Sequence, residues 1–167
     1  NFNNDQFYVN DNGDTIALSR VSQSTYYDKL YDIPPTANYM GKADYLELER
    51  IRFIALSDTF DIEVHIDIRT KYDVNTATFS ADDIIFTLIE DTTVIIQTLN
   101  LEYTDTTLCT SADCIYQDSL ILPNRVFLDV FSNLETVPTG PALYVNTING
   151  IVGFRTSDNK TYELISN

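Results

Sequence analysis

The stretch Asp61–Arg69 reads DIEVHIDIR and decides the fold. Every odd-numbered residue in it is ionisable, and every even-numbered residue is Ile or Val. Side chains of a β-strand point alternately to opposite faces of the sheet. The pattern therefore predicts a half-buried strand with one apolar face and one polar face.

Similar runs of β-branched and aromatic residues fill most of the chain, and turn-forming residues separate them. The expected strands form four hairpins and a closing meander: Gln6–Val9 with Thr15–Ser19, Tyr45–Leu56 with Asp61–Arg69, Ile84–Ile89 with Thr93–Leu101, Ser119–Leu122 with Arg125–Phe131, then Leu143–Val145, Ile151–Arg155 and Tyr162–Ile165. Several short strands joined by tight turns are typical of antiparallel sheets. We expect one all-β domain over residues 1–167, an antiparallel β-sandwich or barrel with short helical turns in its loops.

Three local features qualify this prediction. The segment 24–31 is compatible with a helical turn, and Ser80–Asp83 resembles a helix capping box. The apolar residues of the strand 45–56 change parity half-way along, from Leu46 and Leu48 to the odd positions after them. A β-bulge near Glu49 and Arg50 would repair that change.

Charge restricts the partners that the chain can bind. The sequence has 25 acidic and 10 basic residues, a formal net charge of −15. Such a field disfavours nucleic acid and anionic membrane surfaces, and it favours cations or a basic patch on a protein. No apolar stretch approaches the roughly 18 residues of a membrane-spanning helix. The chain begins at Asn1 without a leader, so we expect a mature form that has lost a signal peptide.

The two cysteines, Cys109 and Cys114, are separated by a short polar loop. Their even number and close spacing favour a local disulfide and hence an oxidising compartment. Free thiols are the first alternative. Zinc is the second, but it needs four ligands, and the chain offers two cysteines and one histidine.

The same alternating strand carries the candidate catalytic and metal-binding residues. Its polar face has Asp61, Glu63, His65 and Asp67, which suggests a divalent metal site or a histidine oriented by a carboxylate. A solvated sheet face with ion pairs explains these residues equally well. A Ser or Cys nucleophile would have only His65 as its base, and no glycine-rich nucleophile or phosphate motif is present. We therefore assign no catalytic residue.

Two further groups could bind a ligand. The segment Asp11–Asp14 reads DNGD and has the oxygen ligands that calcium prefers, although a hairpin turn explains the same residues. No other cofactor is expected. Four tyrosines precede the long strand at 45–56 and would suit an interface with a protein or glycan, or would plug the core under a loop: Tyr26, Tyr27, Tyr31 and Tyr39.

The run Leu143–Leu164 contains a tyrosine, a GIVGF segment, a turn at 157–160 and a final YEL. It resembles the closing hairpin of small cell-surface lipoproteins of Bacteroidetes, with Asn159-Lys160 where that pattern has an Asp-Gly turn and Tyr162 where it commonly has Trp. The opening run Phe7–Thr15 is similar to the first hairpin of such proteins. The resemblance implies export, a β-rich domain of unassigned activity, and a lipid anchor on an N-terminal cysteine that this chain has lost.

The resemblance also implies O-glycans, because proteins of that phylum carry them on Ser or Thr that follows Asp and precedes an aliphatic residue or Thr. The matching positions are Thr15, Thr92, Thr106 and Ser119.

These observations favour a non-catalytic module that is secreted or held at the cell surface or outer membrane, for binding, adhesion or assembly of the cell envelope. Two alternatives stay open. The first is a carbohydrate-active or metal-assisted hydrolase that uses carboxylates near His65. The second is an accessory subunit of an outer-membrane complex, in which the acidic surface meets a basic partner.

Overall fold

The structure is a computed structural model that describes residues 5–30, 46–57, 61–73, 78–90, 94–103, 107–109, 114–133 and 140–166. Over these residues it is all-β and antiparallel. The strands are β1 (Gln6–Asn10), β2 (Thr15–Leu30), β3 (Leu46–Leu56), β4 (Ile62–Asp73), β5 (Thr78–Glu90), β6 (Val94–Tyr103), β7 (Thr107–Cys109), β8 (Cys114–Ile121), β9 (Val126–Asn133), β10 (Ala142–Asn146), β11 (Gly150–Arg155) and β12 (Thr161–Ser166). The all-β prediction is confirmed.

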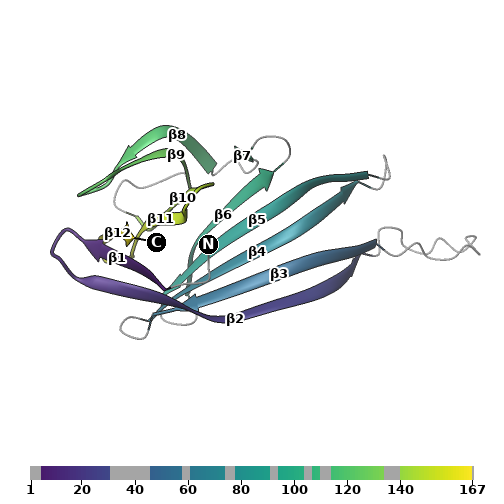
Figure 1. Cartoon of the computed structure of the whole chain (residues 1–167), viewed down its shortest axis with the longest axis horizontal. Coiled ribbons are helices and arrows are strands. Elements are labelled where there is room, and N and C mark those ends of the chain that lie inside the picture. The colour runs from purple at the N-terminus through teal and green to yellow at the C-terminus, as the bar shows by residue number, and fades with distance from the viewer. Residues whose placement is uncertain are drawn as a thin grey trace, which may run out of the picture.

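The strands pair in the order β7-β6-β5-β4-β3-β2-β1-β12-β11-β10-β9-β8, so every strand but the first and last pairs with two neighbours. Within the described residues no pairing joins β7 to β8, and the arrangement is therefore a sandwich rather than a closed barrel. We call β1, the start of β2 and β8–β12 sheet A, and the rest of β2 with β3–β7 sheet B. Figure 1 shows the long strands of sheet B extending beyond sheet A.

Strand β2 joins the two sheets. It pairs with β1 up to Leu18 and with β3 from Ser19 onward. The register shifts between Arg20 and Ser22, which marks a bulge just after the strand enters sheet B. A bulge bends a strand and increases its twist, which is what a strand needs when it turns the corner of a sandwich.

This bulge corrects one prediction. The apolar change of parity in β3 suggested an irregularity at Glu49 and Arg50, but β3 pairs residue for residue with β2 across both positions. The shift lies in β2 instead, because the corner between the sheets is there.

Both expected helical turns are also wrong. Residues 24–30 continue β2, and Tyr31 lies outside the described residues. Ser80–Asp83 lies in β5, where Ala81 and Asp82 pair with Lys71 and Thr70 of β4. In a capping box, side chains accept hydrogen bonds from backbone N–H groups at the start of a helix. In β5 the backbone groups pair with β4 instead, so the capping side chains are not needed.

The expected hairpins and the closing meander are confirmed by the strand pairing. Three of the described turns contain a residue with positive φ. Gly13 and Gly150 have φ values of 85° and 77°, and Asn159 has 70°. Only Gly adopts such angles freely, and Asn tolerates them better than most residues.

One apolar core runs through both sheets. Sheet B contributes alternate residues of β4, β5 and β6, whereas β10 and β11 of sheet A are buried over nearly their whole length. Aromatic rings join the centre of sheet A. The ring of Phe154 lies 5.2 Å from that of Tyr8 and 5.3 Å from that of Tyr162. Within the described residues no helix is long and apolar enough to span a membrane.

Candidate functional site

Strand β4 has the two faces that its sequence predicts. Ile62, Val64 and Ile66 are buried in the core, and Glu63 and His65 on the opposite face are half-buried. The polar face is therefore the outer side of sheet B, where a solvated surface and a catalytic site would look alike in the sequence.

The structure does not assemble these polar residues into one site. Nε2 of His65 contacts a carboxylate oxygen of Glu63, while Arg69 places Nη2 4.0 Å from Oδ2 of the buried Asp67. Asp61 is exposed in the bend before the strand. Among the described residues, no three His, Cys, Asp or Glu side chains are placed to hold a metal ion. The contacts described on this face join His65 to Glu63 and Arg69 to Asp67.

The DNGD segment forms a tight turn around a buried side chain. Oδ1 of Asn10 accepts hydrogen bonds from the backbone N–H of Asn12 and of Asp14, at 3.0 and 2.8 Å. Its Nδ2 donates to Oδ2 of Asp14 at 3.0 Å. The side chain of Asp14 thus stabilises the hairpin. Calcium binding on the acidic surface stays a prediction.

The other predicted site residues are only partly visible. Tyr26 and Tyr27 are in β2 opposite Arg50 and Glu49, but their side chains lie outside the described part of the chain, as do residues Tyr31 and Tyr39. Of the predicted glycosylation positions, Thr15 and Ser119 are exposed, and Thr92 and Thr106 lie outside the described residues.

The two cysteines end one strand and begin the next. Cys109 is the last residue of β7 and Cys114 the first of β8, and these strands contact each other. Cys114 packs against the core, and no cysteine among the described residues is a free thiol. The side chain of Cys109 lies outside the described part of the chain, so the Cys109–Cys114 disulfide stays a prediction.

The most exposed apolar surface was not predicted from the sequence. Ile121 of β8 is 78% exposed, and Val126 and Leu128 of β9 are 60% and 61% exposed. In the β8–β9 pairing Ile121 lies opposite Val126, and Leu128 lies opposite the exposed Ser119. Residues opposite one another in a sheet share a face. We call Ser119, Ile121, Val126 and Leu128 the hairpin face.

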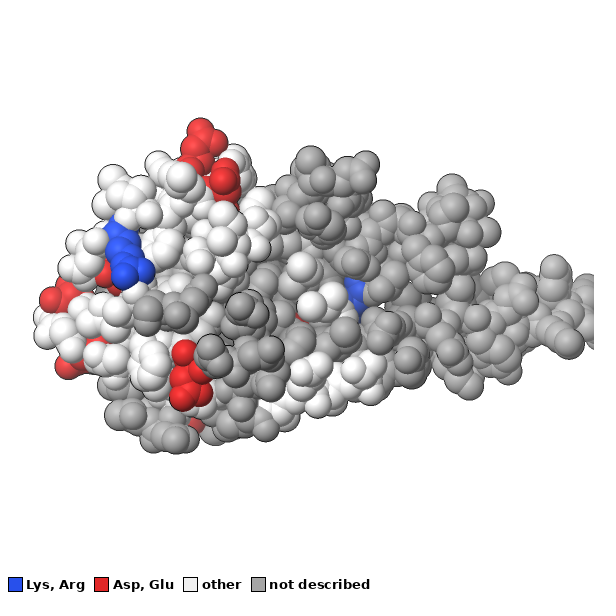
Figure 2. All heavy atoms as spheres, viewed as in Figure 1, with Lys and Arg blue, Asp and Glu red and all other residues white. Residues whose placement is uncertain are grey.

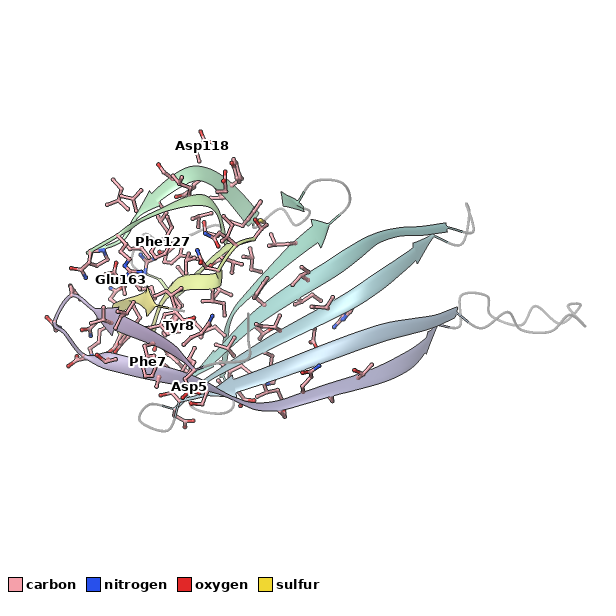
Figure 3. All side chains as sticks on the ribbon, in the orientation of Figure 1. Asp5, Phe7, Tyr8, Asp118, Phe127 and Glu163 are labelled. Atoms are coloured by element: carbon pink, nitrogen blue, oxygen red, sulfur yellow. The ribbon has the colours of Figure 1, made fainter. Side chains whose placement is uncertain are left out.

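The other side of this hairpin faces β10–β12, the strands of sheet A that follow it. Phe127 and Leu122 are buried, and a Cβ on Gly153 of β11 would lie 2.8 Å from Cδ1 of Leu122. The same Cβ would lie 2.7 Å from the carbonyl oxygen of Tyr162 in β12, so glycine at 153 allows both close approaches. In Figure 1 β8 and β9 arch over β10–β12, and Figure 3 places Phe127 and Glu163 beneath the hairpin with Asp118 on its outer side.

A buried carboxylate anchors the turn of the hairpin. Glu163 of β12 is 1% exposed. Its Oε2 accepts a hydrogen bond from the backbone N–H of Asn124 at 3.0 Å, and its Oε1 accepts one from Nδ2 of the same residue. Charge-assisted hydrogen bonds of this kind are stronger than neutral ones. They hold the turn 122–125 against β12 and keep the hairpin face turned outward.

Acidic residues lie in the middle of the hairpin. Asp118 and Asp129 are both exposed, and Asp129 has a φ of 53°. The hydroxyl of Tyr116 donates to Oδ1 of Asp129 at 2.7 Å. This hydrogen bond, with partial burial and the charges of both carboxylates, raises the pKa of Tyr116 to about 12. Figure 2 shows acidic atoms at the top of the molecule, where Figure 3 labels Asp118.

No family model, no curated protein and no solved structure matches this chain.

Sequence reasoning predicted the β8–β9 hairpin but missed its exposed face. The stretch 119–122 reads SLIL, and Val126 and Leu128 alternate with Phe127. Apolar residues at both parities show that both sides of the hairpin carry apolar side chains. They do not show which side the domain itself covers.

Proposed function

We propose that this chain is a non-catalytic, exported module that binds a partner at the cell surface or in the cell envelope, with the hairpin face as its contact surface. The observation that carries the proposal is the high exposure of Ile121, Val126 and Leu128 on one face of a hairpin whose opposite side is anchored. Soluble proteins seldom leave aliphatic residues clustered in this way, and such clusters commonly mark interaction sites.

Export is supported by the cysteines and by the resemblance to small cell-surface lipoproteins of Bacteroidetes. We propose a Cys109–Cys114 disulfide between the end of β7 and the start of β8, which an oxidising compartment would maintain. Thr15 and Ser119 are exposed and accessible to a glycosylating enzyme. Intact mass of the natively produced protein, with and without reductant and thiol alkylation, tests both modifications.

A hydrolase centred on His65 has less support. The imidazole contacts Glu63, which could orient it as a base. However, both residues lie on the outer face of sheet B, and Asp67 lies 4.0 Å from Arg69. Among the described residues, no cluster of three His, Cys, Asp or Glu side chains that could hold a metal ion forms around the histidine.

Co-purification from native envelope tests the binding function. The bait is the whole chain, and the variant is Ile121→Lys with Leu128→Lys, which charges the hairpin face without touching its buried side. Phe7→Lys is the matched control, because Phe7 is 42% exposed on β1 and lies far from Asp118 in Figure 3. We expect a specific partner that the double variant loses and the control keeps. Equal recovery by all three proteins, or none by the wild type, contradicts the proposal.

A further inference from the structure

The free edge of β8 adjoins the hairpin face. Strand β8 is eight residues long and ends the strand order. It contacts β6 and β7, but among the described residues its only strand pairing is with β9. An edge strand presents a row of backbone N–H and C=O groups that an extended segment can complete by adding a strand.

This edge lacks most of the features that protect sheet edges in natural proteins. Common protections are lysine or proline in the edge strand, a very short strand, or a cover. Strand β8 contains no lysine and no proline, and its single charge is Asp118. From there to the turn it carries Ser119, Leu120 and the exposed Ile121. A long edge with exposed aliphatic side chains is an aggregation hazard unless a partner occupies it.

Charge decides between a second copy of the chain and a different partner. The chain has a net charge of −15, and Asp118 lies directly beside the apolar end of β8, with Asp129 on the neighbouring strand. Two copies joined along β8 would bring these carboxylates together. Like charges across a strand pair are destabilising, whereas opposite charges stabilise it. The edge therefore fits a basic segment.

We propose that the β8 edge receives an extended basic and aliphatic segment of a partner protein as an added β-strand. The added strand carries Lys or Arg opposite Asp118. It carries aliphatic residues opposite Ser119 and Ile121, where they extend the hairpin face beside Val126 and Leu128. This inference rests on the proposed binding function and adds the mode of binding and the chemistry of the partner.

The experiment uses the whole chain and a capped eight-residue peptide that alternates Val and Lys. Affinity is measured by fluorescence anisotropy, and backbone N–H exchange is followed residue by residue by NMR. We expect saturable binding and slower exchange confined to β8, from Tyr116 to Ile121. A peptide with a central proline lacks one backbone donor and bends, so we expect it to bind at least about tenfold more weakly.

Charge reversal tests the register of the partner. Asp118→Lys should weaken binding of the Val/Lys peptide by about tenfold and improve binding of a Val/Glu peptide by a similar factor. Asp11→Lys is the matched control, because Asp11 is exposed in the β1–β2 turn and changes the net charge equally. The control should leave both affinities within about twofold, since exposed charges at a distance are screened.

Four outcomes overturn the inference. Equal effects of Asp118→Lys and Asp11→Lys would show binding by overall charge alone. Protection away from β8 would place the peptide elsewhere. Protection of β8 that rises with protein concentration and without peptide would show that a second copy occupies the edge. If the envelope partner is lost on charging the hairpin face while β8 exchange stays fast in its presence, the binding function stands and strand addition fails.

Discussion

Strands β4 and β11 are buried in different ways. In β4 polar and apolar residues alternate, and only the apolar side enters the core. In β11 the four residues Ile151–Phe154 are all buried, so both faces of this strand are covered. On one of these faces Leu122 of the β8–β9 hairpin approaches Gly153. Alternating apolar residues therefore indicate a strand with one covered face, and a continuous apolar run indicates a strand with two.

The largest expected effect separates the two faces of β4. Ile66→Ala should lower the free energy of unfolding by about 2–5 kcal/mol, because it leaves a cavity in the core. Its neighbour His65 faces outward, and His65→Ala should cost less than about 1 kcal/mol. Urea unfolding of both variants measures the contrast. Equal losses would mean that the outer face of sheet B is covered after all.

The next effect tests the close packing around Gly153 of β11. A Cβ on Gly153 would lie 2.7 Å from the carbonyl oxygen of Tyr162 and 2.8 Å from Leu122. Gly153→Ala should therefore cost about 1–3 kcal/mol by overpacking. Gly13→Asn is the control, because a Cβ there meets nothing within 4 Å and asparagine tolerates its φ of 85°. A Gly153→Ala protein as stable as the control would contradict the close packing of β11 against Tyr162 and Leu122.

The anchor of the hairpin turn gives a smaller effect. In Glu163→Gln one acceptor oxygen becomes an NH₂ group that faces a donor of Asn124. We expect a loss of about 1 kcal/mol and faster backbone exchange in the turn 122–125. The same change at Glu63, on the outer face of sheet B, should cost within about 0.5 kcal/mol. Unchanged exchange in the turn would contradict the anchoring role.

The smallest effect concerns two tyrosines. Burial raises the pKa of Tyr8 in the core, and the hydrogen bond to Asp129 raises that of Tyr116 to about 12. The raised pKa of Tyr116 favours its neutral hydroxyl in the folded state. The stability that Tyr116 contributes is therefore present below pH 10 and is lost as the pH rises through 12. Asp129→Asn should return the Tyr116 titration toward its usual range. Absorbance at high pH follows it, and an unshifted titration would contradict the hydrogen bond.

The one-sided strands were readable from the sequence because their signal is local. Alternation identified the buried side of β4. Gly and Asn are residue types that tolerate positive φ, and Gly13, Gly150 and Asn159 lie in turns where the structure has such angles. Neither signal requires knowledge of distant residues. The fold class, the hairpins and the closing meander follow from them.

The two-sided region was not readable because its signal depends on pairs far apart in the chain. Gly153 is required where the carbonyl oxygen of Tyr162 and the side chain of Leu122 both approach it, and Glu163 is tolerated in the core because Asn124 supplies two donors. The bulge in β2 likewise depends on where two sheets meet. The candidate site has the same difficulty: exposure of Ile121 is a property of what surrounds it.

Strand β1 pairs with β2 on one side and with β12 on the other. A growing chain can therefore form the hairpins of sheet B in sequence, each from neighbours already synthesised. Sheet A can be completed only after residues near 160 have been synthesised, because β1 has no β12 to pair with until then. Contacts of such long sequence separation slow folding. The pairing of β1 with β12 is therefore expected to form late, after the hairpins of sheet B.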